Sequence, residues 1–299
     1  MAGLMIGIVV ASVFFGVIYV FVLQRNKARR QLAEEKARSE SLLRRIAADL
    51  EQAARIQRDL LPKKTPDLEG CDIAGINVPC YEVGGDYYDF IPIDGDRLGV
   101  VIADVSGKGI SASLLMASLR AALLAEVRPD CVLERMAARL SDFVYASSGP
   151  SHFVTFFFGE VDRRTFELRY VNAGHNPPFI LGPDGTRRDL ESSGFPLGMF
   201  AGSTYRTGTI SLEPGDLAVL YTDGISEGRN AQGEDYSDVR LAALVRESRR
   251  LGAAEICFKV LADVQDYACG TQPCDDITLV IVKRSAAGAS PRTDHQPFI

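Results

Sequence analysis

The 299-residue sequence predicts an α+β fold in which β-sheets pack together and helices cover their outer faces. Hydrophobic residues make up 46% of the chain and charged residues 24%, which excludes a disordered chain. Short segments rich in Val, Ile, Phe and Tyr predict strands, and longer amphipathic segments predict helices. Their order is strands, two helices, strands, two helices and a last strand, which differs from a regular βαβ array.

The first segment is a run of twenty residues without charge, from Leu4 to Leu23. As a helix it would be about 30 Å long, which matches the hydrocarbon core of a bilayer. A cleaved signal peptide would need basic residues before the run and a cleavage site after it, whereas here the basic residues follow. We therefore expect residues 1–24 to form a single transmembrane helix in the cell (inner) membrane. The N-terminus would lie outside and the chain after Arg25 in the cytoplasm.

Residues 25–62 are predicted to form a basic helical linker, because helix-forming residues dominate and the first proline is Pro62. The net charge is +6 over residues 25–64 and −12 over the residues that follow, and the acidic body argues against nucleic acid as a partner. A 4-3-4-3 spacing predicts a short coiled-coil seam, through which residues 42–61 could form a homodimer. A solvated connector is the alternative. The seam positions are Ile46, Leu50, Ala53, Gln57 and Leu60.

Residues 63–284 contain the predicted strands and helices, and the tail 285–299 is expected to be disordered. Strands are expected at 71–78, 87–93, 98–103, 153–161, 166–172, 217–222 and 277–283. Helices are expected at 110–128, 131–147, 236–249 and 253–268. The six cysteines show neither a C-x-x-C pair nor a His at zinc spacing. We expect free thiols, four or five of them in the core, and no zinc site.

Asp residues stand at the ends of several predicted strands, beside glycines or a second Asp. Asp86 follows two glycines, Asp104 and Asp223 each end an apolar strand, and Asp275–Asp276 precede the last one. A single such Asp is normally a turn residue, but several that converge repel one another unless cations neutralise them. Carboxylates without Cys or His select Mg²⁺ or Mn²⁺. Two such ions can activate a water and neutralise a phosphoryl group.

At these residues the sequence resembles the metal-dependent (PPM) serine/threonine protein phosphatases, in the bacterial branch typified by stage II sporulation protein E and RsbU. The resemblance covers roughly residues 54–284 and implies a four-layer α-β-β-α sandwich of two mixed β-sheets. Its motifs, in order, are AARIQRDLLP, VGGDYYDF, ADVSGKGISASLLMA, FVTFFFGEVD, NAGHNPP, GFPLGM, YTDGISEGRN and DDITLVIV.

The resemblance implies two ions, Mn²⁺ or Mg²⁺, with Asp104 as the ligand that bridges them and Asp276 as the less favoured residue of the final pair. The implied metal ligands are Asp86, Asp104, the backbone carbonyl of Val105, Asp223, Asp275 and Asp276. The implied catalytic residues are Asp86, Asp104, Asp223 and Asp275. The implied reaction is hydrolysis of phosphoserine or phosphothreonine by a metal-activated water, without a phosphoenzyme. The implied partner is a phosphorylated protein, an anti-sigma-factor antagonist.

The sequence departs from many eukaryotic relatives, which carry a general-acid His after the bridging Asp, whereas residues 105–109 read VSGKG. His175 is one candidate for this acid, but we favour a structural role in which it fixes a tight turn with Asn172. Lys108 could neutralise part of the substrate phosphate, and a solvated turn lysine is the equal alternative.

Two other functions are considered. A pseudophosphatase would bind phosphoprotein without hydrolysing it, but such a module has no chemical need for the metal carboxylates. A nucleotidyl cyclase would need base- and ribose-recognition residues, for which there is no signal. In the resembling family the helix ending in LLP connects a regulatory module to the catalytic domain. Few residues precede the apolar run here, so we expect the signal to arrive through the membrane, a protein partner or dimerisation of residues 42–61.

Overall fold

The computed structural model of the protein describes residues 2–148, 152–269 and 275–285. It describes no side chains for residues 2–6, 8–12 and 28. The chain divides into two compact units, Met1–Gln52 and Ala53–Ile299. Most of the predicted disordered tail, from residue 286 onward, lies outside the described residues.

Helix α1 (Ala2–Leu60) covers the first unit and continues into the second. The predicted apolar segment and linker are therefore one helix, which ends just before Pro62 because proline cannot continue it. In the first unit, the large apolar side chains described between Val13 and Leu23 are all exposed. No helix in the described residues combines the length and hydropathy of a membrane span. Part of the predicted transmembrane run, residues 4–6 and 8–12, consists of residues whose side chains are not described.

The second unit contains two five-stranded sheets. The first sheet has the order β1-β10-β9-β6-β7, and the second sheet has the order β2-β3-β4-β5-β8. The strands of the first sheet are β1 (Cys71–Val78), β6 (Phe179–Leu181), β7 (Arg187–Asp189), β9 (Leu217–Tyr221) and β10 (Ile277–Arg284). Those of the second sheet are β2 (Tyr87–Pro92), β3 (Arg97–Val105), β4 (Val154–Asp162), β5 (Glu167–Ala173) and β8 (Gly208–Ser211).

All neighbouring strands described in these two sheets are antiparallel, so the expectation of mixed sheets is wrong. The reason lies in the connections. A single crossover helix returns the chain for a parallel strand. Here two helices link β3 to β4, and two long helices preceded by a four-residue helix link β9 to β10. Two successive helices carry the chain out and back, so the next strand starts at the end where the previous one stopped.

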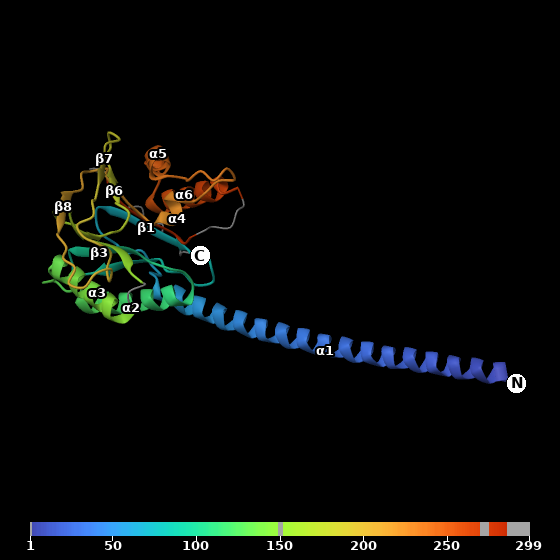
Figure 1. The fold of residues 1–299 in the computed structure, drawn as a ribbon. Coiled ribbons are helices and arrows are strands. Elements are labelled where there is room, and N and C mark those ends of the chain that lie inside the picture. Colours follow the sequence, from blue (N-terminus) through green and yellow to red (C-terminus); the bar gives the residue numbers. More distant parts are fainter. Residues whose placement is uncertain (1, 149–151, 270–274, 286–299) are drawn as a thin grey trace. The chain divides into compact units, whose positions relative to one another are not determined.

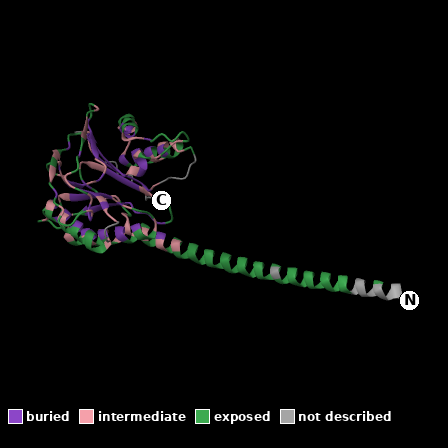
Figure 2. Ribbon diagram, in the orientation of Figure 1, coloured by how far each residue is buried: buried purple, intermediate pink, exposed green. Residues whose placement is uncertain are grey.

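The four-layer α-β-β-α order is confirmed. Helices α2 (Ile110–Glu126) and α3 (Leu133–Ser148) pack on the second sheet, and α6 (Ala253–Tyr267) packs on β1 and β10 of the first sheet beside α5 (Asp238–Ser248) (Figure 1). Buried side chains form three clusters, one under each helix layer and one between the sheets. Figure 2 shows the strands mostly buried and the outer helix faces exposed. Each layer interface therefore excludes water.

Strands β6, β7 and β8 were not predicted, nor was the four-residue helix α4 (Asp223–Ser226). The seven predicted strands and four predicted helices are confirmed, with boundaries that shift by one or two residues. Of the cysteines, Cys71, Cys80, Cys131, Cys257 and Cys269 are free thiols, and Cys274 lies outside the described residues. Only Cys257 among those five is buried, so the expectation of a mostly buried set is wrong.

Candidate metal centre and active site

The predicted carboxylates lie where the strands of each sheet begin or end. In the second sheet, Asp86 directly precedes β2 and Asp104 is the penultimate residue of β3. In the first sheet, Asp223 begins α4 just after β9, and Asp275 lies two residues before β10. Because β2 pairs antiparallel with β3, and β9 with β10, the start of one strand lies beside the end of its partner. In each sheet, the acidic residues therefore lie together at one end of the strands.

The acidic residues of the two sheets also meet one another. Burial, together with the negative charges of Asp223, Asp275 and Asp276, raises the pKa of Asp104 to about 7. Burial and the charges of Asp104 and Asp276 likewise raise the pKa of Asp86. The pKa of Asp223 is raised by burial and by Asp275. The negative charges of these carboxylates therefore act on one another, and they repel in the absence of cations.

Asp86 is held by hydroxyl groups from the opposite sheet. Its side chain is 4% exposed, and one carboxylate oxygen accepts hydrogen bonds from the Thr222 hydroxyl at 2.7 Å and the Thr278 hydroxyl at 2.5 Å. The Thr278 hydroxyl in turn accepts a bond from the side-chain amide of Asn77 at 2.8 Å. Asp86 therefore joins the two sheets as well as contributing charge.

The two adjacent residues Asp275 and Asp276 have different surroundings. Asp276 is buried, and its carboxylate accepts backbone N–H bonds from Cys80 at 2.8 Å, Gly85 at 2.7 Å and Asp86 at 3.3 Å. The Asp276 carboxylate thereby fixes the loop that carries Asp86. Asp275 is half-exposed and pairs with the Lys108 ammonium at 2.7 Å. This arrangement favours Asp275 as the ligand and Asp276 as its support.

Cys80 brings its sulfur within 4.8 Å of oxygens of Asp275 and Asp276. Burial and the neighbouring Asp276 raise the pKa of the Cys80 thiol to about 12, so it stays protonated at neutral pH. A protonated thiol is a poor ligand for a hard cation. A hard cation therefore prefers the carboxylate oxygens of Asp275 and Asp276 to this thiol.

Glycines leave room for the backbone at this site. A Cβ at Gly85 would lie 3.0 Å from the carbonyl oxygen of Val105, the predicted backbone ligand. A Cβ at Gly224 would lie 2.0 Å from the carbonyl oxygen of Asp276. A side chain at either position would displace the segments that bear the carboxylates. A set of carboxylates and one backbone carbonyl fits Mg²⁺ or Mn²⁺, which prefer oxygen ligands.

His175 is not placed as a proton donor. It is 3% exposed, and both ring nitrogens have hydrogen-bond partners within the protein. Burial lowers its pKa to about 4, so the ring is neutral at physiological pH. Asn172 accepts a bond from the His175 backbone N–H at 2.9 Å and donates to the His175 carbonyl at 3.2 Å. The predicted tight turn formed with Asn172 is confirmed.

Sequence reasoning missed the two threonines on Asp86 and the role of Gln57. Thr222 directly precedes Asp223, and Thr278 lies two residues after Asp276, so both stand inside the acidic motifs. The side-chain amide of Gln57 donates to the carbonyl of Gly84 at 2.7 Å and accepts from its N–H at 3.0 Å. No local pattern reveals this pair, because 27 residues separate its members.

Comparison with known proteins decides the family. The model of the stage II sporulation protein E (SpoIIE) family matches residues 94–285. The chain belongs to the SpoIIE family. It is 34% identical to phosphoserine phosphatase RsbU of Bacillus subtilis over 80% of this chain and 71% of RsbU. It is 29% identical to protein IcfG of Synechocystis sp. over 89% of this chain and 45% of IcfG. The chain thus spans about half the length of IcfG.

Solved structures give the same fold for this SpoIIE-family chain. The SiaA-PP2C domain of Pseudomonas aeruginosa superposes with a TM-score of 0.71 at 22% identity, over 81% of this chain and 98% of that domain. The RsbU and RsbW domains of a Mycobacterium tuberculosis protein give a TM-score of 0.62 at 28% identity, over 77% of this chain and 63% of that one. The second unit of the chain therefore has the fold of a PP2C-type phosphatase domain.

Proposed function

We propose that the protein hydrolyses phosphoserine or phosphothreonine in a phosphorylated protein, with two divalent cations bound among the converging carboxylates. The observation that carries this proposal is that Asp86, Asp104, Asp223 and Asp275 stand at the paired strand ends of the two sheets, where burial and mutual repulsion raise the pKa of Asp104. So many carboxylates around one point are unfavourable unless a cation is bound there. Pseudophosphatase function remains the alternative that the assay below separates.

The residues that would hold the ions are Asp104, the Val105 carbonyl, Asp223 and Asp275, with Asp86 beside them. A pair of Mg²⁺ or Mn²⁺ ions, when bound, activates a water for attack on phosphorus and neutralises the phosphoryl oxygens. The crystal structure of RsbX, which has this fold with a TM-score of 0.58 at 15% identity, is a complex with magnesium.

The protein groups hold Asp86 and the loop beside it in fixed positions for this reaction. In this hydrolysis the oxygen of a water molecule forms a bond to phosphorus and the P–O bond to the serine or threonine oxygen breaks. The water gives up a proton, and the leaving oxygen takes one up. Thr222 and Thr278 fix Asp86, and the three N–H bonds to Asp276 fix the loop beside it. Lys108 lies at the half-exposed rim, where an ammonium group can attract a phosphate once Asp275 binds a cation.

The test measures release of inorganic phosphate from a phosphorylated protein by the full chain in the presence of Mn²⁺. We expect activity in the wild type and loss of activity in Asp104→Asn or with a chelator. Asp142→Asn, an exposed position on α3, is the matched control and should keep full activity. Full activity in Asp104→Asn would overturn the proposal. A wild type that binds the phosphoprotein but releases no phosphate with any divalent ion would identify a pseudophosphatase.

We infer that the substrate is a phosphorylated anti-sigma-factor antagonist, a small protein. The support is the 34% identity to the phosphoserine phosphatase RsbU. The prediction is that the full chain dephosphorylates such an antagonist with higher kcat/KM than an unrelated phosphoserine protein of similar size. Equal kcat/KM for both substrates would contradict it.

We propose that the chain is anchored in the cell membrane through residues 1–24, with the phosphatase domain in the cytoplasm. The support is the charge-free run 4–23, the basic residues that follow it, and the exposed apolar side chains between Val13 and Leu23. The full chain should sediment with membranes, and a variant lacking residues 1–24 should not. A full chain found in the soluble fraction would refute the anchor.

We propose that α1 also transmits the activating signal to the phosphatase domain. Gln57 holds both polar backbone groups of Gly84, two residues before Asp86, so a shift of this part of α1 would move the loop that carries Asp86. Dimerisation of residues 42–61 is the input that the next experiment tests. Replacing residues 1–41 with an unrelated dimeric coiled coil should change the turnover rate, and a monomeric helix in the same place should not. Equal kinetics for the two fusions would exclude dimerisation as the signal.

A further inference from the structure

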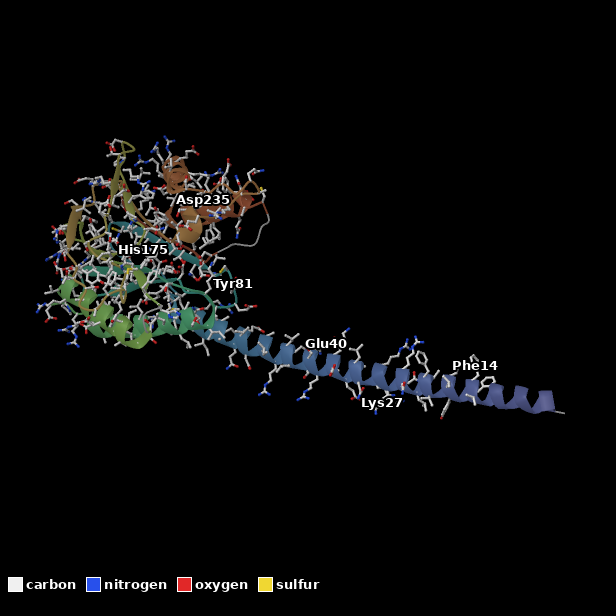
Figure 3. The ribbon with its side chains drawn as sticks, viewed as in Figure 1. Phe14, Lys27, Glu40, Tyr81, His175 and Asp235 are labelled. Atoms are coloured by element: carbon white, nitrogen blue, oxygen red, sulfur yellow. The ribbon has the colours of Figure 1, made fainter. Side chains whose placement is uncertain are left out.

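His175 lies in the interior of the phosphatase domain, with its imidazole hydrogen-bonded to both sheets. Its Nδ1 is 2.9 Å from the hydroxyl oxygen of Thr155 on β4, and its Nε2 is 3.1 Å from the carbonyl oxygen of Tyr221 on β9. Strand β4 belongs to the second sheet and β9 to the first. Figure 3 shows His175 among the strands of the domain.

The hydrogen-bond partners determine which nitrogen carries the proton. The Tyr221 carbonyl can only accept, so Nε2 must carry the hydrogen. The neutral ring then has a lone pair on Nδ1, which accepts from the Thr155 hydroxyl. Each nitrogen therefore has one matched partner. Because burial keeps the ring neutral at physiological pH, this arrangement does not change with pH near 7.

Both partners lie close in sequence or register to candidate metal ligands. Tyr221 is the last residue of β9, two residues before Asp223. Thr155 is the register partner of Asp104 on the neighbouring strand. Thus one imidazole links the strand end that precedes Asp223 to the residue paired with Asp104.

The backbone around His175 is held as firmly as its ring. Asn172 bonds to the N–H and the carbonyl of His175 and also donates to the Leu190 carbonyl at 3.0 Å. Gly174 has φ +67°, and a Cβ there would lie 2.4 Å from the Pro196 ring, so only glycine fits. The imidazole therefore projects from a firmly held turn that directly follows β5, the strand paired with β4.

We propose that His175 is a positioning residue that sets the separation of Asp104 and Asp223, so that the affinity for divalent cations depends on its two side-chain hydrogen bonds. This inference rests on the proposed metal-dependent phosphatase function. Groups that hydrogen-bond directly to metal ligands commonly change metal affinity about 10- to 100-fold when they are removed, which sets the upper range for His175. His175 reaches the ligands through the backbone of two strands rather than by direct contact.

The test is calorimetric titration of Mn²⁺ into the metal-free full chain, well below the melting temperature of every variant. We expect His175→Ala to raise the Mn²⁺ dissociation constant about 10-fold or more. His175→Gln keeps an amide donor for Tyr221 and should restore part of the affinity. Thr155→Val removes one O–H donor with little change in volume and should weaken binding several-fold. Leu133→Ala, a buried change in the α3 layer, controls for lost stability and should leave the dissociation constant unchanged.

The outcomes separate this inference from the proposed function. A wild type that binds no Mn²⁺ would defeat the phosphatase proposal itself. If the wild type binds Mn²⁺ and folded His175→Ala or Thr155→Val binds it equally well, the positioning role is wrong. If His175→Ala fails to fold, Thr155→Val and His175→Gln still decide the question. A second readout is the pH profile of kcat. A neutral buried ring donates no proton to the leaving group, so we expect His175→Gln to keep the alkaline limb of the wild-type profile.

Discussion

The ammonium group of Lys108 lies 2.7 Å from a carboxylate oxygen of Asp275, across the rim of the carboxylate cluster. A cation that binds Asp275 must compete with this ion pair. Both side chains are about 40% exposed, so water weakens the pair to about 1 kcal/mol or less. Lys108→Met should therefore tighten Mn²⁺ binding by about two- to five-fold in calorimetric titration. Lys259→Met, at an exposed position on α6, should have no effect, and weaker Mn²⁺ binding in Lys108→Met would contradict the prediction.

The stability of the metal-free protein should fall as pH rises toward neutrality. The pKa of Asp104 is about 7 in the folded protein and 3.8 as its ordinary value, so between these values the folded state binds more protons than the unfolded state. Its contribution to stability is present below pH 4 and is lost as pH rises through 7. At pH 7.5 with chelator, Asp104→Asn should raise the free energy of unfolding by at least about 1 kcal/mol.

The measurement is thermal or urea unfolding from pH 4.5 to 7.5, with Asp142→Asn as the exposed control. The difference between Asp104→Asn and the wild type should shrink at the acid end, where Asp104 is already protonated. If Asp104→Asn is less stable than the wild type at pH 7.5, the neighbouring carboxylates do not repel Asp104 in the metal-free state.

The pairing of Gln57 with Gly84 predicts an effect on turnover that exceeds its effect on stability. Gln57→Ala removes two hydrogen bonds that hold the loop before Asp86. We expect kcat for p-nitrophenyl phosphate to fall about three- to ten-fold, because small displacements of catalytic groups are costly. Gln52→Ala, an exposed position one and a half turns earlier on the same helix, should behave as wild type. Equal kcat in the two variants would show that the contact between α1 and Gly84 does not affect turnover.

The close approach at Gly224 predicts that a single methyl group disrupts the site. In Gly224→Ala the new Cβ would lie 2.0 Å from the backbone oxygen of Asp276, so α4 and the segment before β10 must move apart. We expect a loss of about 1–3 kcal/mol in the free energy of unfolding together with weaker Mn²⁺ binding. Gly95→Ala, in the turn between β2 and β3, meets no atom within 4 Å and should change neither. Wild-type Mn²⁺ affinity in Gly224→Ala would contradict the close packing.

Much of the secondary structure could be predicted because the core strands are long and apolar. Segments such as β3 and β10 carry continuous runs of Val, Ile and Leu that only a sheet buried on both faces accommodates. Strands β6 to β8 have three or four residues each, and β7 reads Arg-Arg-Asp, so they lack a recognisable pattern. The antiparallel direction followed from the paired helices between strands, which the predicted helix order already contained.

The identity of the candidate site residues could be predicted more readily than their individual surroundings. Asp86, Asp104, Asp223 and Asp275 were each visible as an acidic residue at a strand end. Which of Asp275 and Asp276 faces inward depends on the backbone at one turn, and this follows from the bonds to the loop at 80–86. The bonds of His175 join residues 20 and 46 positions away, so no local motif contains them.

The position of β10 within its sheet has a consequence for synthesis of the protein. The last strand of the domain lies between β1, the first strand, and β9. A chain still emerging from the ribosome cannot complete this sheet until residues 277–284 are available, because β1 and β9 are joined only through β10. Two unpaired strand edges stay open until that moment, which exposes the nascent chain to aggregation. Asp275 also arrives with this segment, so phosphatase activity should begin only when translation of the domain is complete.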